Sequence, residues 1–178
     1  MRHFALSAIG RDRPGIVAGV SANLLEHAVN IEDSQMSILR GHFTLVLILE
    51  AADDVDTESL RTDLARTASH LGLEAWSLGE IAQAASAAEP SCIVTVYGVD
   101  HPGIVHAVAQ ALAEREVNIT DLQTRLVSEP GSDGLYAMTL ELSLPAGLSR
   151  EDLEELFAGV RSAQGVQVSV RELEQDVL

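Results

Sequence analysis

"GRDRPGIV" at Gly10–Val17 returns as "GVDHPGIV" at Gly98–Val105, 88 residues further along the chain. Over the 26 positions that begin with each glycine, Gly10–Gln35 and Gly98–Gln123, fourteen residues are identical between the two copies. A repeat of this length predicts two copies of one structural unit. We place the units at residues 1–81 and 91–178. Residues 82–90, "AQAASAAEP", have no apolar periodicity and are interpreted as a linker.

The spacing of apolar residues predicts the same first elements in both copies. Arg2–Ile9 and Ser91–Gly98 alternate or are rich in β-branched residues, which indicates strands. The following segment carries Ile16, Val20 and Leu24 at helical spacing, and the second copy repeats this pattern. We expect Pro14 and Pro102 in the first turns of these helices, with Asp12 and Asp100 as caps.

The remaining elements of each copy are two strands, a helix and a last strand. Residues 42–51 alternate so that Phe43, Leu45, Leu47 and Leu49 share one face. In the second copy the hairpin before the matching strand gains five residues within "SEPGSDG", which predicts a longer turn. The second helices are expected to end at Gly72 and Gly165.

The predicted fold is therefore α+β, with two tandem ferredoxin-like βαββαβ domains. Each has an antiparallel four-stranded sheet with both helices on one face. Units of this size bury small cores, and their open sheet edges favour pairing. We expect a homodimer.

Composition excludes several classes of function. The formal charge is −16 and the chain has no lysine, which argues against direct binding of nucleic acid. The longest apolar run, Leu45–Leu49, is too short for a membrane span, so a cytoplasmic protein is expected. No nucleophile–base pair or metal-ligand set stands out, and His101 and His106 lack a third ligand. We therefore predict no catalytic residue, no metal site, no cofactor and no enzymatic activity.

The repeated loop is suited to binding a small amino acid. A glycine at a helix start allows a carboxylate to approach free backbone N–H groups at the positive end of the helix. Asn30 or Asn118 could accept a hydrogen bond from the ligand's ammonium group. The alternatives stay open: Pro14 and Gly15 form only a turn, the two aspartates only cap helices, or the asparagines only hold a turn before a strand.

The stretch "GRDRPGIVAGVSANLLEHAVNIEDSQMSILRGHFTLVLIL", Gly10–Leu49, resembles the ACT-domain family of regulatory amino-acid-binding modules. Within that family the chain is similar to the tandem proteins of the glycine cleavage system transcriptional repressor family. The resemblance implies that an amino acid binds where the loop after the first strand meets a neighbouring ACT unit. By position it implicates Asp12, Arg13, Pro14, Gly15, Asn30 and Ile31, and in the second copy Asp100, His101, Pro102, Gly103, Asn118 and Ile119.

The resemblance favours a non-catalytic, amino-acid-sensing regulator that acts through a protein partner, such as a transcription regulator, rather than on DNA. The alternative is a regulatory subunit or module that controls an enzyme of amino-acid metabolism. Glycine and serine are the first effectors to test.

Overall fold

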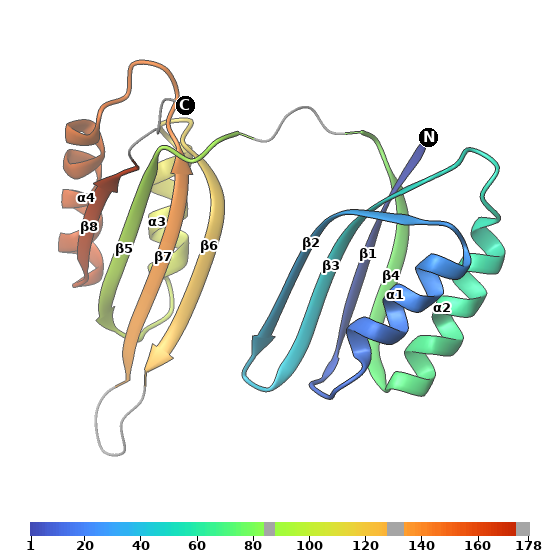
Figure 1. The fold of residues 1–178 in the computed structure, drawn as a ribbon. Helices are drawn as coiled ribbons and strands as arrows, with labels where there is room; N and C mark the ends of the chain where they lie inside the picture. The colour runs from blue at the N-terminus through green and yellow to red at the C-terminus, as the bar shows by residue number, and fades with distance from the viewer. Residues whose placement is uncertain (84–87, 128–133, 174–178) are drawn as a thin grey trace. The chain divides into compact units, whose positions relative to one another are not determined.

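The computed structural model describes residues 1–83, 88–127 and 134–173. The chain divides into two units, Met1–Ala85 and Ser86–Leu178, and each has the order βαββαβ (Figure 1). The predicted fold class is confirmed. The elements are β1 (Arg2–Arg11), α1 (Ile16–Glu26), β2 (Asn30–Leu39), β3 (His42–Ala51), α2 (Thr57–Leu71), β4 (Leu73–Ile81), β5 (Cys92–Val99), α3 (Ile104–Ala113), β6 (Asn118–Val127), β7 (Leu135–Ser143), α4 (Arg150–Gln164) and β8 (Gln167–Glu172).

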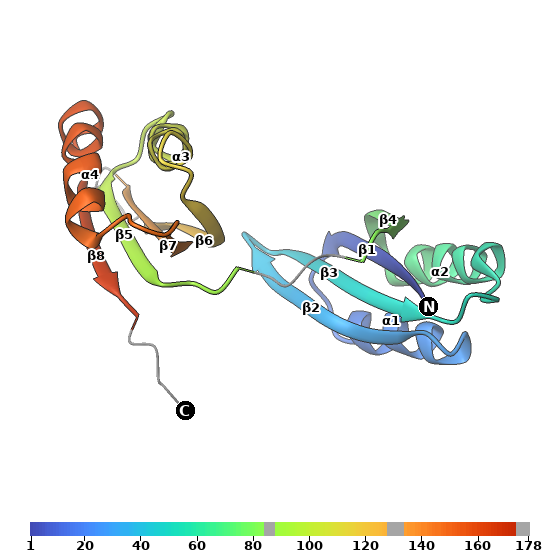
Figure 2. The same cartoon turned by 90° about the horizontal axis from the view of Figure 1, so that it is seen from above.

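Each unit is a two-layer sandwich of one antiparallel sheet and two helices. The strand order is β2-β3-β1-β4 in the first unit and β6-β7-β5-β8 in the second. Within each unit both helices cover the same face of the sheet, as Figure 2 shows from above. The other face carries no helix, and the outer strands β2 and β4 are sheet edges in the first unit.

The core of each unit consists of the residues that the alternating patterns predicted. Phe43, Leu45, Leu47 and Leu49 of β3 are all buried. They pack with residues of α1, such as Leu24, and the corresponding apolar positions of β7 are buried in the second unit. Period-two alternation on a strand that faces helices on one side accounts for this agreement.

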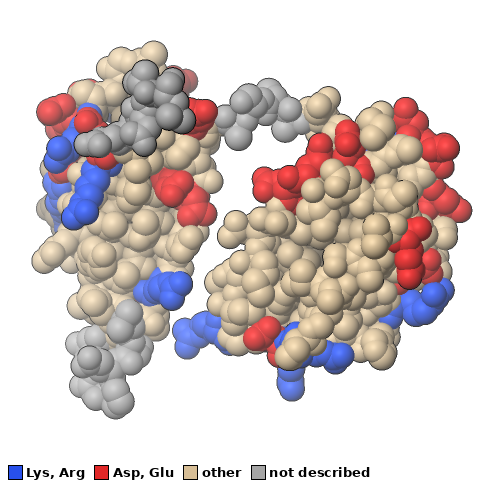
Figure 3. Space-filling model, in the orientation of Figure 1, with Lys and Arg blue, Asp and Glu red and all other residues tan. Residues whose placement is uncertain are grey.

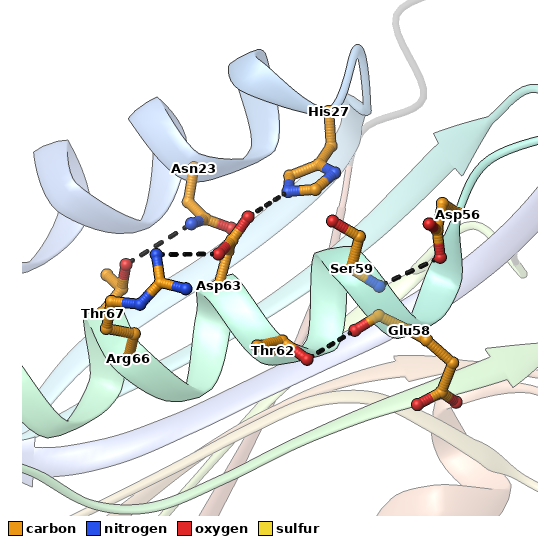
Figure 4. A network of polar contacts seen from close by, with 9 residues as sticks. All are labelled: Asn23, His27, Asp56, Glu58, Ser59, Thr62, Asp63, Arg66 and Thr67. Atoms are coloured by element: carbon orange, nitrogen blue, oxygen red, sulfur yellow. Dashed lines mark hydrogen bonds and ion pairs between the residues drawn. The ribbon is translucent and has the colours of Figure 1, made fainter.

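Polar contacts join α1 to α2 in the first unit (Figure 4). The His27 imidazole lies 2.9 Å from the Asp63 carboxylate. The same carboxylate forms an ion pair with Arg66, three residues later on α2. Asn23 is buried between the helices and donates only a long hydrogen bond of 3.4 Å to the Thr67 hydroxyl. The Asn23 Oδ1 atom is buried without a hydrogen-bond partner.

The second helices begin and end as their sequences indicate. The Asp56 side chain accepts the Ser59 N–H at the start of α2, and Ser149 forms a reciprocal capping box with Asp152 at the start of α4. Gly72 and Gly165 end the two helices in the left-handed conformation, as predicted.

Two sequence features have only partial structural description. β4 ends at Ile81 and β5 begins at Cys92, on either side of the expected linker. The expected longer hairpin of the second unit, residues 128–134, lies outside the described residues except for Gly134. Within the described ranges, no helix has the length and apolar character needed to cross a membrane.

Candidate functional site

The repeated Pro-Gly motif forms a tight turn that starts the first helix of each unit. Gly15 is the residue before α1, with φ of 96°, and Gly103 occupies the same place before α3 with φ of 107°. This left-handed region strongly favours glycine. The helices begin at Ile16 and Ile104, so Pro14 and Pro102 precede the first helical turn instead of lying in it. That detail of the prediction was wrong.

The expected capping by Asp12 and Asp100 was also wrong. Neither α1 nor α3 has a side-chain hydrogen bond at its N-cap, because the glycine turn separates each aspartate from the helix start. The backbone N–H of Asp12 instead donates to the Gly41 carbonyl oxygen of the β2–β3 hairpin (3.3 Å), and that of Asp100 donates to Gly134 (3.2 Å). Both aspartate side chains are exposed and free of the capping role.

The helix starts beside these turns offer unfilled hydrogen-bond donors. The first N–H groups of a helix have no partner within the helix, and here no side chain caps them. A Cβ atom built on Gly15 would meet nothing within 4 Å, so the space in front of this turn is open. Open backbone donors at the positive end of a helix can bind a carboxylate.

Arg13 and His101, predicted as ligand contacts, bind the last turn of the second helix in each unit. The Arg13 guanidinium donates to the His70 carbonyl oxygen at 3.5 Å. In the second unit, His101 Nε2 lies 2.9 Å from the Gln164 carbonyl oxygen. Cations suit the negative end of a helix. These side chains therefore anchor the loop, which is a role that the sequence analysis did not assign.

His101 has a second contact that affects its protonation. Its Nδ1 atom lies 3.1 Å from the Pro102 carbonyl oxygen, so both ring nitrogens face acceptors. Only the imidazolium can donate from both nitrogens. The hydrogen bonds to Gln164, and secondarily to Pro102, raise the pKa of His101 above its ordinary value.

Asn30 and Ile31 lie at the opposite end of the sheet from the Gly15 turn. Asn30 pairs with Glu50, and Glu50 pairs with His3 near the start of β1. The Gly15 turn comes after Arg11, the last residue of β1. Arg11 is eight residues beyond His3, which corresponds to roughly 26 Å of strand. The same pairing holds Asn118 opposite Ser143 in the second unit. A single unit therefore does not bring its loop and its asparagine together.

Charge is distributed unequally between these two ends of the first unit. The end with the Gly15 turn carries Arg11, Arg13 and Arg40 beside Asp12 and Glu74, whereas the Asn30 end carries Glu32, Asp33, Glu50 and Asp53 beside Arg2. Figure 3 shows basic and acidic side chains gathered at opposite ends of this unit. One end is suited to a carboxylate and the other to an ammonium group.

A hollow among the described residues lies elsewhere. It is a shallow depression of about 380 Å³ in the second unit, between the start of β5 and the start of α4. Its lining includes Cys92, Ser149 and Glu172. Burial raises the pKa of the Cys92 thiol, which keeps this sulfur protonated and poorly nucleophilic. Neither glycine turn contributes to the depression.

Comparison with known proteins identifies relatives of both the sequence and the fold. A family model described as ACT domain matches residues 2–76 and 91–129. A UPF0237 protein of Methanopyrus kandleri is 40% identical over 75 residues, which cover 42% of this chain and 83% of that protein. A UPF0237 protein of Corynebacterium efficiens is 36% identical over 80 residues, covering 44% and 84% respectively.

Nearly the whole chain superimposes on solved crystal structures. A protein of unknown identity from Galdieria sulphuraria superimposes with a TM-score of 0.78 at 27% identity, covering 97% of this chain and 98% of that one. A candidate glycine cleavage system transcriptional repressor superimposes with a TM-score of 0.72 at 20% identity, covering 98% of both chains. The two βαββαβ units therefore occur in tandem in other proteins.

Proposed function

The chain belongs to the ACT domain family, and on that basis we propose that it is a non-catalytic regulator that senses a small amino acid. The observation that carries the proposal is the uncapped helix start at the Gly15 and Gly103 turns. Each turn leaves the first N–H groups of a helix without a capping side chain. The ligand's carboxylate binds these donors, and glycine or serine is small enough to lie against the backbone there.

The ammonium group of the ligand can donate three hydrogen bonds, and the exposed Asp12 carboxylate at the loop end of the same unit supplies only part of the acceptors it needs. Asn30 and the neighbouring acidic side chains are suitable acceptors, but they lie at the far end of their own sheet. We propose that β2 pairs in antiparallel fashion with β2 of a second copy of the chain. The start of one β2, with Asn30, then lies level with the end of the other β2. That end is next to the Gly15 loop of its own chain, because the Asp12 N–H donates to the Gly41 carbonyl oxygen of the β2–β3 hairpin.

The surface of β2 supports this pairing. β2 is an edge strand, and nine of its ten residues are exposed. Met36 and Ile38, on the helix side of the strand, keep 46% and 43% of their surface exposed. Antiparallel pairing also places the acidic start of one strand beside Arg40 of the other, so the charges are complementary.

We further propose that the regulator acts through a partner protein in the cytoplasm. A charge of −16 without lysine opposes contact with phosphates, so a role in transcription requires a partner that itself binds DNA. The full-length structural similarity to a candidate glycine cleavage repressor makes glycine the first effector to examine.

A thermal-shift screen of the twenty amino acids tests the proposal, because a ligand that binds the folded state stabilises it by mass action. We expect glycine or serine to raise the melting temperature, and Asn30→Ala to reduce the shift. Absence of a shift with every amino acid would contradict a sensing role. Co-purification from cell extract, with and without the effector, then distinguishes a transcription regulator from a metabolic enzyme as partner.

A further inference from the structure

Three potential metal ligands from three neighbouring strands meet on the helix-free face of the first sheet. They are His3 of β1, Glu32 of β2 and Glu50 of β3. One ligand atom from each lies within 4.8 Å of the others. Because these residues are far apart in the sequence, they do not form a recognisable metal-binding sequence motif.

Strand register explains why the three side chains converge. His3 is paired directly with Glu50, so both point to the same face of the sheet. The β2–β3 pairing shifts between Ile31 and Asp33, which leaves Glu32 as the extra residue of a β-bulge. A bulge redirects a side chain relative to the regular alternation. Here it lets Glu32 approach His3, with Nε2 and the carboxylate oxygen 3.5 Å apart.

The chemistry of the cluster fits a divalent cation. Imidazole and carboxylate together suit zinc and similar first-row ions, with metal–ligand distances near 2.0–2.2 Å. Ligand atoms around a tetrahedral ion at that distance are on the order of 3.3 Å apart. The His3–Glu32 separation of 3.5 Å is close to this value, and the Glu50 ligand atom lies within 4.8 Å of both.

Electrostatics favour an ion at this position. The Glu32 and Glu50 carboxylates are close neighbours and repel each other. Glu50 forms no ion pair within the described part of the chain, and the Glu32 carboxylate lies 3.5 Å from His3 Nε2. The His3 side chain is only 12% exposed, which limits screening by water. A divalent cation would neutralise both carboxylates at once.

The second unit lacks this ligand set although it keeps the same local backbone. Its β6–β7 pairing has a shift between Ile119 and Asp121, so Thr120 takes the place of Glu32. Ser143, opposite Asn118, takes the place of Glu50, and Ser91 that of His3. The bulge is therefore shared, and only the first unit has ligands.

We propose that His3, Glu32 and Glu50 form a binding site for one divalent transition-metal ion of the zinc type, with at least one coordination position open. This site lies at the Asn30 end of the sheet, away from the Gly15 turn. It shares Glu32 and Glu50 with the acidic end proposed to face the ligand's ammonium group, so a bound cation and that ammonium group would compete for these carboxylates. From the sequence we predicted no metal site, because no ligand spacing indicated one; the register of the three strands brings these ligands together instead.

Calorimetric titration of the full chain with Zn²⁺ and with Co²⁺ tests the site. We expect one ion per chain, and at least a tenfold loss of affinity in each of His3→Gln, Glu32→Gln and Glu50→Gln. The matched controls are His42→Gln and Glu58→Gln, which remove an exposed histidine and an exposed carboxylate elsewhere in the first unit. Both should bind like the parent.

Nuclear magnetic resonance supplies a second readout that does not depend on stoichiometry. Zn²⁺ should shift the His3 imidazole signals first among the six histidines. Circular dichroism confirms that each variant is folded. Equal affinity of the three site variants and the parent, or simultaneous shifts at several histidines, would overturn the proposal and indicate nonspecific surface binding.

Discussion

At the scale of single residues, His101 acts as a pH-sensitive anchor for the loop of the second unit. Its pKa is raised in the folded state by hydrogen bonds to the Gln164 and Pro102 carbonyl groups. The stabilisation from the imidazolium is fully present below the unfolded-state pKa, about 6.5. It is lost as the pH rises through the higher, folded-state value. The second unit should therefore become less stable on passing from mildly acidic to mildly alkaline solution.

The variant His101→Arg tests this anchor. The first unit uses Arg13 at the same place, so arginine should keep the contact to the helix end without titrating near neutral pH. A proton titration should place the His101 pKa above about 6.5, and His101→Arg should remove the corresponding pH dependence of unfolding. An unshifted titration of His101 would contradict the assignment.

Asn23 is a second residue whose effect on stability can be predicted. Its Oδ1 is buried without a partner, and its one hydrogen bond is long. The second unit has Ala111 at the repeated position. We expect Asn23→Ala to change the free energy of unfolding by less than about 1 kcal/mol, because it removes an unsatisfied acceptor. Leu24→Ala, the matched control in the core, should cost about 2–5 kcal/mol.

The single tryptophan makes this comparison convenient. Trp76 packs against the core of the first unit, so its fluorescence during denaturant titration reports that unit. A loss of several kcal/mol in Asn23→Ala would show that the amide has a structural role that its contacts do not reveal.

Gly15 is constrained by backbone conformation and not by space. A Cβ atom there meets no neighbour, but φ of 96° is unfavourable for other residues. We expect Gly15→Ala to cost roughly 1–3 kcal/mol. Gly15→Asn should cost less, because asparagine tolerates left-handed conformations better. Gly15→Asn is therefore the better variant for blocking ligand approach, and denaturant titration of both variants checks the order.

At the scale of elements, β2 is an exposed edge strand, and its outer backbone groups are available to pair with another chain. Met36 and Ile38 lie on its helix side, beyond the cover of α1. We expect the parent to scatter light as a dimer at micromolar concentration and Met36→Glu to shift this proposed dimer toward monomer, because the variant places a carboxylate in the proposed contact. The control is Leu25→Glu on α1, where the side chain is 78% exposed and outside the contact. Equal mass for both variants and the parent would contradict pairing through β2.

The elements themselves could be predicted well from the sequence, and the reason is periodicity. β3 alternates without interruption, so Phe43 and Leu45 identify its buried face unambiguously. β2 was harder because its bulge changes the alternation. Ile31 and Met36 are five residues apart, yet both pair with core residues of β3. This odd spacing is the signal of an inserted residue between them, and the strand register identifies that residue as Glu32.

The candidate site could be predicted only in part. The glycine turn is local, so its sequence shows it, although the helix start proved to be one residue after Gly15. The distance between Gly15 and Asn30 depends on strand register, which neither motif encodes. The anchoring contacts of Arg13 and His101 depend on where the second helix ends in space. Tertiary geometry therefore decides which predicted residues can meet.

At the scale of the whole molecule, net charge makes a clear prediction about nucleic acid. The formal net charge is −16, and the eleven arginines are the only strongly basic side chains. The purified protein should therefore not retard duplex DNA in a gel, even at low salt. The same DNA should be retarded when a DNA-binding partner is added. Retardation by the protein alone that weakens steeply with salt would contradict action through a partner.

The central claim is that a small amino acid binds to a composite site with one turn and one β2 start from different copies of the chain. The most direct measurement is calorimetric titration of glycine and serine into dimers that combine a Gly15→Asn chain with an Asn30→Ala chain. In the mixed dimer, one site combines the altered turn of the first chain with the altered β2 start of the second chain. The other site combines the normal turn of the second chain with the normal β2 start of the first, so it stays intact. We predict that the mixed dimer recovers half of the parent's β2 sites at parental affinity, whereas each variant alone binds weakly there. Parental binding by both variants, or no recovery on mixing, would contradict the composite site.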